Sequence, residues 1–301
     1  MDSATAAAAE VAEPRKAGIF PDMSREAYDA LRDRVNFSTA KWMGKSPAHY
    51  AHAVEHGGGP DTNPLKLGRV THLAVFEPGS FLSGVEVWEG KARRGSAWED
   101  FRTINEGREL VTQAEYFQCA AISKAIREHP VAGKYTRGGQ GEVTLLWTHE
   151  SPAIGELPGY ALDCRARVDY LAPEFIADLK VVRDAGPEGF GRACASYRTY
   201  TQAAEYHDAV LALTGKDLPY WLLAVESTAP YVAQVYRVTE AQLAAGRAEY
   251  RSWFDRIHSC RRDGRYPGYA EAEMDLELPR WDMPPEDEED LSETGLIFPE
   301  E

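Results

Sequence analysis

Two acidic residues, Asp169 and Asp178, lie in neighbouring segments whose alternating apolar and polar residues predict β-strands. The segments are GYALDCRARVDYL (159–171) and EFIADLKVV (174–182), and the connection between them is short enough for a hairpin. If Asp169 lies opposite Asp178, their Cβ atoms are roughly 5 Å apart. Two bare carboxylates at that distance repel each other. We therefore expect a divalent cation between them, and Mg²⁺ suits a site with few carboxylates because it retains waters for chemistry.

Lys180 shares a strand face with Asp178, because side chains two residues apart point the same way. An ammonium group beside a metal-binding carboxylate can orient or deprotonate a water, or stabilise negative charge on phosphate oxygens. Glu142, in the preceding predicted strand GEVTLLWT (141–148), adds a third carboxylate. This combination predicts hydrolysis of a phosphodiester. An Asp-x-Lys pair alone is weak support, since surface strands often carry one.

The order of these residues resembles the PD-(D/E)xK nuclease superfamily. More narrowly, the chain resembles the phage and prophage exonucleases of the exodeoxyribonuclease VIII (RecE-type) group, related to lambda exonuclease and to the RecB nuclease domain. The residue before Asp169 is Val168 rather than the proline of the nominal motif, at a position where members vary. The resemblance covers about residues 20–280 and rests on STAKWMGKSPAHY (38–50), LGRVTHLAVFEPGSF (67–81), RARVDY, IADLKVV and YRTYTQAAEYHDA (197–209).

The resemblance implies a set of metal ligands. Asp169 and Asp178 would bind Mg²⁺ or Mn²⁺, two ions per site, with help from the carbonyl oxygen of Leu179. Glu142 would bind metal directly or through a water. His72 would approach from the helical side, although a histidine in an apolar helix is more often a satisfied core residue.

The resemblance also implies catalytic roles beyond the ligands. Lys180 would serve the attacking water. Gln202 and Tyr206, one helical turn apart, would hold the phosphate or order the carboxylates. Both could instead be core packing with a polar edge.

Several basic or polar residues are candidates for DNA contact. Arg165 and Arg167 share the strand face of Asp169, so they either contact phosphate, which arginine forks match, or form ion pairs with acids. Lys41, Lys45 and Ser46 are weaker candidates for holding the DNA end.

The elements around these residues predict an α/β fold. We expect a restriction-endonuclease-like core with a central mixed β-sheet flanked by helices and a helical N-terminal part. Strands are predicted at 141–148, 159–171 and 174–182, followed by a hairpin around Ala229–Pro230. Helices are predicted at 24–33, 38–44, 46–56, 63–78, about 97–110, 112–129, 196–214 and 240–262.

Composition limits the function classes. The net charge of −15 argues weakly against nucleic acid, and eight acidic residues of that balance lie between Pro285 and Glu301. The four cysteines form no CxxC pair, so a zinc ribbon finds no support and free thiols are expected. No apolar run approaches the roughly 18 residues of a membrane span. The start lacks a secretory signal, so a cytoplasmic location in a bacterial host, or a phage origin, is expected.

We expect one nuclease domain at 19–281, between a disordered arm (1–18) and an acidic disordered tail (282–301). The predicted activity is Mg²⁺-dependent digestion of double-stranded DNA from an end, giving single strands for recombination. The resemblance alone implies 5′→3′ polarity, a single-strand annealing recombinase as partner, and a ring-shaped trimer or tetramer. The alternatives are a structure-specific or restriction-like endonuclease on the same core and a catalytically silent DNA-binding or phage assembly protein.

Overall fold

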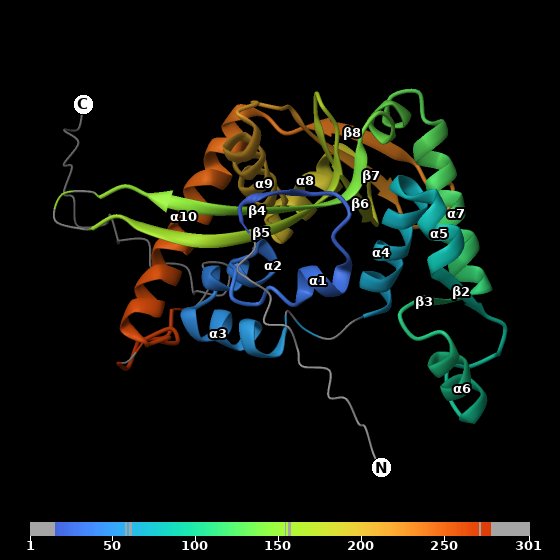
Figure 1. Cartoon of the computed structure of the whole chain (residues 1–301), viewed down its shortest axis with the longest axis horizontal. Helices are drawn as coiled ribbons and strands as arrows, with labels where there is room; N and C mark the ends of the chain where they lie inside the picture. Colours follow the sequence, from blue (N-terminus) through green and yellow to red (C-terminus); the bar gives the residue numbers. More distant parts are fainter. Residues whose placement is uncertain are drawn as a thin grey trace, which may run out of the picture.

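The computed structural model describes residues 16–57, 59, 62–153, 155, 158–270 and 272–277 (Figure 1). The acidic tail predicted at 282–301 and most of the arm predicted at 1–18 lie outside the described residues. Gly18, which the prediction assigned to the arm, is the first residue of a strand. Within the described part of the chain, no helix is long and apolar enough to cross a membrane.

Six strands form the central sheet in the order β1-β4-β5-β6-β7-β8, and a small parallel pair, β2-β3, stands apart. All neighbours in the central sheet are antiparallel except β6 and β7. The α/β class and the mixed central sheet are therefore confirmed. The strands are β1 (Gly18–Phe20), β2 (Val85–Trp88), β3 (Glu109–Thr112), β4 (Gln140–Ser151), β5 (Tyr160–Leu171), β6 (Ile176–Val182), β7 (Tyr220–Glu226) and β8 (Ala233–Arg237).

The helices begin where polar caps satisfy their first free N–H groups. Ser24, Asn36 and Ser46 accept hydrogen bonds at the starts of three N-terminal helices, and Thr112 and Thr239 form capping boxes. The helical elements are α1 (Arg25–Asp29), α2 (Phe37–Ala40), η1 (Lys41–Gly44), α3 (Pro47–His56), α4 (Asn63–Phe76), α5 (Pro78–Gly84), α6 (Ser96–Ile104), α7 (Gln113–Glu128), η2 (Ala132–Thr136), α8 (Pro187–Tyr197), α9 (Thr199–Thr214) and α10 (Glu240–Asp263).

The two faces of the central sheet bury different sets of helices. On one face, Ile176 of β6 and Tyr220 of β7 pack in a core that includes residues of α9 and α10. On the other, Ala177 and Leu179 pack with residues of α4 and α7. Figure 1 shows α4 beside the sheet, and the β4–β5 hairpin projecting well beyond it. Strand alternation thus places each residue of β6 on a defined side.

Three predicted helices differ from the structure. The first, 24–33, ends at Asp29. The helix predicted at 97–110 ends at Ile104, and the chain then forms β3, whose four residues are too few for an alternating pattern to emerge. The helix predicted at 196–214 is the second of two, because α8 precedes it and Arg198 adopts a left-handed conformation between them. The expected hairpin around Ala229–Pro230 is confirmed as β7–β8.

Candidate metal centre

The candidate centre lies where β5 and β6 separate. The two strands pair only at Tyr170–Ala177 and Leu171–Ile176, so the next residues along each strand are Asp169 and Asp178. The backbone groups of β6 beyond this point face a gap that the ladder does not fill, and buried backbone groups need other partners. The sequence expectation that Asp169 lies across from Asp178 agrees with this register.

Asp169 and His72 supply those partners to Leu179. Its N–H donates a hydrogen bond to Oδ2 of Asp169 at 2.9 Å. Its carbonyl oxygen lies 3.0 Å from Nε2 of His72, and because a carbonyl only accepts, Nε2 carries the hydrogen and donates it. One residue of β6 therefore fixes both the Asp169 carboxylate and the His72 ring. The carbonyl oxygen of Leu179, expected to assist a metal, lies within this group.

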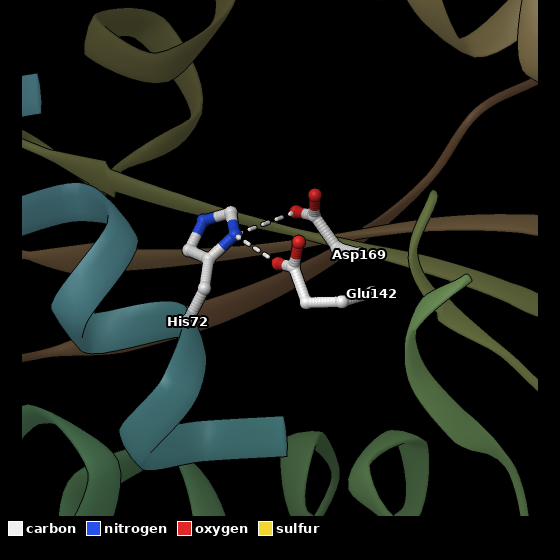
Figure 2. A group of neighbouring side chains, drawn as sticks. All are labelled: His72, Glu142 and Asp169. Atoms are coloured by element: carbon white, nitrogen blue, oxygen red, sulfur yellow. Dashed lines mark ion pairs between the residues drawn. The ribbon is translucent and has the colours of Figure 1, made fainter. Parts of the chain in front are cut away.

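His72 reaches the strands from α4, on the side opposite α9. With Nε2 held by Leu179, Nδ1 points to the carboxylates, 3.4 Å from Oδ2 of Asp169 and 3.7 Å from Oε1 of Glu142. Figure 2 shows both carboxylates converging on this nitrogen. One ligand atom from each of the three side chains lies within 4.8 Å of the others, close enough for a single cation to contact all three.

Glu142 enters the group from β4 through an unusual backbone conformation. The pairs Gly141–Tyr170 and Val143–Val168 flank it, so it lies opposite Asp169 in register. Its φ of 52° is left-handed, which few residues other than glycine adopt and which interrupts the ladder at this point. Such strain persists where surrounding contacts hold it, and it concentrates at functional sites.

Asp178 and Lys180 form the other half of the centre, on the α9 side of β6. Lys180 Nζ lies 2.6 Å from Oδ2 of Asp178 and donates to Oε1 of Gln202 at 3.1 Å. Asp178 is 1% exposed, and apart from this contact with Lys180 neither of its oxygens has a hydrogen-bond partner within the described residues. A buried carboxylate with a single counter-ion and free lone pairs suits a further cationic ligand.

The site's charges strongly perturb its titration. Burial would lower the pKa of His72, but the Asp169 and Glu142 carboxylates raise it to about 9. Burial, reinforced by the charge of Asp178, raises the pKa of Asp169 well above its usual range. Burial opposes ionisation of Glu142 as well, but His72 and Arg167 lower the pKa of Glu142 to about 2.

The carboxylates of Asp178 and Asp169 stabilise the positive charge of Lys180. Burial would lower the pKa of Lys180, but Asp178 and then Asp169 raise it. In the metal-free protein Lys180 is therefore an ammonium ion. This favours charge stabilisation over removal of a proton, the other role that the sequence left open.

The donor set fits a small divalent cation. His72 Nδ1 and the carboxylates of Glu142 and Asp169 converge, and the Asp178 carboxylate follows the last residue pair between β5 and β6. Oxygen donors with one imidazole are typical of Mg²⁺ or Mn²⁺ rather than of a structural zinc site. The residues predicted as ligands are thus brought together by the fold.

The other two predicted catalytic residues lie on α9. Gln202 accepts a hydrogen bond from Lys180, whereas the prediction was that it holds the phosphate or orders the carboxylates. Tyr206, one turn further, is 7% exposed, and burial raises the pKa of its hydroxyl well above the usual range. Between them Glu205 is 1% exposed, and neither of its carboxyl oxygens has a hydrogen-bond partner within the described residues.

The predicted DNA contacts are distributed differently. Arg165 is buried, donates to the carbonyl oxygen of Tyr28 and stacks over its ring, so it has no accessible guanidinium for a phosphate. Ser46 is 1% exposed and caps α3. The burial of these two side chains therefore argues against a DNA contact by either Arg165 or Ser46. Lys45 is exposed, without an ion pair in the described part of the chain. Lys41 is exposed too, and local desolvation and the charge of Lys180 lower its pKa.

Two residues near the site differ from the leading expectation. Arg167, a candidate phosphate contact, instead pairs with Glu142 at 2.7 Å, the alternative that the sequence left open. Glu205, which is buried next to Tyr206 on α9, was overlooked. The four cysteines are free thiols, as expected.

The chain is similar to known proteins in sequence and in fold. Residues 36–275 match a family model described as a PDDEXK-like domain of unknown function (DUF3799). A crystal structure titled "Putative exonuclease" from Eubacterium rectale is similar, with a TM-score of 0.54 and 16% identity. The match covers 85% of this chain and 95% of that one, and at this identity it bears on the fold alone. No curated protein matches the chain.

Proposed function

The chain belongs to the family of the PDDEXK-like domain of unknown function, and from that premise we propose that it is a metal-dependent nuclease that digests double-stranded DNA from an end. The restriction-endonuclease-like fold agrees with this proposal. The family's printed description names no reaction, so the chemistry of the side chains carries the proposal.

One observation carries most weight. Asp178 is buried at the gap between two strands, with Lys180 Nζ 2.6 Å from Oδ2 as its one ion-pair partner in the described chain and no other donor on either oxygen. Burying a carboxylate whose lone pairs are mostly unpaired is unfavourable, so a purely structural role does not explain this residue. A site that takes up a cation explains both the unpaired lone pairs of Asp178 and the convergence of His72, Glu142 and Asp169.

The residues divide the work of phosphodiester hydrolysis. His72, Glu142, Asp169 and Asp178 would hold Mg²⁺ or Mn²⁺, in a site for two ions. When bound, the metal would lower the pKa of a water and polarise a phosphate oxygen. Lys180 lies beside it as a fixed positive charge where negative charge develops on the phosphate, which preorganised groups stabilise strongly.

Gln202 holds that lysine in place. Its Oε1 accepts a hydrogen bond from Nζ of Lys180, and Oδ2 of Asp178 forms an ion pair with the same nitrogen. The ammonium group is thereby held between Asp178 and Gln202. Positioning of this kind supports catalysis because little reorganisation is then needed during the reaction.

The finer features of the proposal rest on the resemblance described from the sequence. They are a 5′→3′ direction, single-stranded products used in recombination, a single-strand annealing recombinase as partner, and a ring-shaped trimer or tetramer that encloses DNA. The excess of acidic residues counts weakly against DNA as the substrate, although a nuclease needs only cations at the centre and a local basic track.

A comparison of DNA ends tests the exonuclease. Linear duplex DNA labelled at either the 5′ or the 3′ end, and a covalently closed circle of the same sequence, are incubated with the full chain and Mg²⁺. We expect the linear DNA to be degraded, the 5′ label to be released first, and the circle to stay intact because it offers no end.

Cutting of the circle would replace the exonuclease by an endonuclease on the same centre. Early release of the 3′ label would reverse the direction. If neither Mg²⁺ nor Mn²⁺ supports cleavage of any of these DNAs, the nuclease proposal is wrong.

A further inference from the structure

Arg167 is held in place by protein groups on several sides. Its Nε donates to Oε2 of Glu142 at 2.7 Å, and its Nη1 donates to the carbonyl oxygen of Met23 at 3.0 Å and to Oγ1 of Thr144 at 3.4 Å. The side chains of Arg167 and Glu142 are 16% and 18% exposed. The guanidinium therefore has a fixed position before any ligand arrives.

The two oxygens of Glu142 have different surroundings as a result. Oε2 is taken by Arg167, whereas Oε1 faces Nδ1 of His72 at 3.7 Å. Glu142 also needs a left-handed backbone to project from β4, a conformation that its own side chain does not favour. The contact with Arg167 is the shortest that the Glu142 side chain makes within the described residues, so it is the contact best placed to hold this geometry.

A phosphate contact explains the same arginine less well. Two of its three nitrogens are already engaged, and one of them is bound to a backbone carbonyl of the N-terminal segment. A DNA phosphate would have to compete with Glu142 for the guanidinium. Glu142 and Asp169 both face Nδ1 of His72, so their carboxylates lie close together. The ion pair with Arg167 offsets the negative charge of Glu142 and so reduces the repulsion between them.

We propose that Arg167 is a positioning residue of the metal centre, which fixes Glu142 through Oε2 so that Oε1 is presented to the cation beside His72 and Asp169. This inference rests on the proposed function, since it presupposes that a cation binds. It assigns Arg167 to the protein side of the site and not to the DNA. Partners of this kind orient the direct ligands, and losing one typically weakens metal binding 10- to 100-fold.

Direct Mn²⁺ binding tests the inference without any cleavage. Mn²⁺ is titrated into the full chain, and the free ion is followed by electron paramagnetic resonance. We expect Arg167→Gln to raise the Kd for Mn²⁺ about 10- to 100-fold, and Arg167→Lys, which keeps the charge, to raise it less. Melting temperatures without metal show that each variant is folded, and the lysine variant provides the test if the glutamine variant is not.

A double-mutant cycle identifies the route of the effect. If Arg167 acts through Glu142, then Glu142→Gln weakens binding, and adding Arg167→Gln to it has little further effect. Arg137 provides a matched control, because it is an exposed arginine shortly before β4 and forms no ion pair in the described part of the chain. Arg137→Gln removes the same charge and should leave the Kd for Mn²⁺ within about twofold of the native value, since surface ion contacts contribute little.

Two results would overturn the role of Arg167. One is an unchanged Kd for Mn²⁺ in Arg167→Gln together with weaker DNA binding in Ca²⁺. The salt dependence of that DNA binding would then be smaller by about one phosphate contact. The other is full additivity of the two substitutions in the cycle. A native chain that binds no Mn²⁺ would instead remove the proposed metal centre itself, so the two failures are distinguishable.

Discussion

Replacing Lys180 by methionine should lower the rate of DNA cleavage by at least about two to three orders of magnitude, the usual cost of losing a preorganised charge at the reacting centre. Methionine keeps an unbranched apolar side chain of similar length but has no ammonium group. Asp178→Asn should have an effect of the same order, because it removes a carboxylate that would hold the cation. The measurement is the single-turnover rate with saturating Mg²⁺.

A lysine remote from the centre provides the control. Lys124 is exposed on α7 and forms no ion pair in the described part of the chain, so Lys124→Met should cleave DNA at the native rate. DNA binding in Ca²⁺ should survive in all three variants. Near-native cleavage by Lys180→Met or by Asp178→Asn, in a protein that binds DNA normally, would show that these residues are not the catalytic ones.

Glu205 should make the folded protein less stable as the pH rises. Burial raises the pKa of this carboxyl from 4.5 to about 8, and no positive partner offsets the burial. The unfolded chain releases the proton near pH 4.5, whereas the folded chain keeps it until about pH 8. Stability from this group is therefore fully present below pH 4.5 and is lost as the pH rises to about 8, at about 1.4 kcal/mol per pH unit.

The free energy of unfolding in urea, measured at intervals from pH 5 to pH 8, tests this slope. Other groups titrate in the same range, so the quantity to compare is the difference between the native chain and Glu205→Gln. The free energy of unfolding of the native chain should fall relative to that of Glu205→Gln as the pH rises. Glu188, 91% exposed on α8, is the matched control, and Glu188→Gln should follow the native curve. Parallel curves for the native chain and Glu205→Gln would mean that Glu205 is ionised or partnered in the folded state.

The metal ligands could be predicted because they depend on short-range rules. The two-residue period of strands places Asp178 and Lys180 on one face, and a short connection fixes the register that brings Asp169 opposite Asp178. The position of His72 depends on a helix that its own sequence defines well, from Asn63 to Phe76. The resemblance to known nucleases added the expectation that this helix faces the strands.

The partners of the arginines could not be predicted in the same way. Arg165 and Arg167 do share a face, but what covers that face is the segment around Met23 and Tyr28, about 140 residues away in the chain. Strand periodicity says which side a residue takes and not what lies there. Glu205 escaped notice because buried positions lie all around α9, so its helical pattern marks no solvent face for an acid to occupy.

Three short strands and one helix boundary could not be predicted from the sequence, for local reasons. β1, β2 and β3 have three or four residues each, which is too few for alternation to distinguish a strand from a loop. The break between α8 and α9 occurs at Arg198, a residue type that rarely adopts the left-handed conformation found there. A proline at the first position of α8, Pro187, was the available signal for that helix.

Hydrolysis of linear duplex DNA with and without a divalent cation tests the metal-dependent nuclease most directly. The native chain and Asp169→Asn are incubated with uniformly labelled linear DNA in Mg²⁺, in Mn²⁺ or in excess chelator, and acid-soluble nucleotides are counted. We predict rapid release by the native chain with either metal, none with chelator, and a loss of about two to three orders of magnitude in Asp169→Asn. Equal release with and without metal, or undiminished release by Asp169→Asn, would contradict a cation centre at His72, Glu142, Asp169 and Asp178.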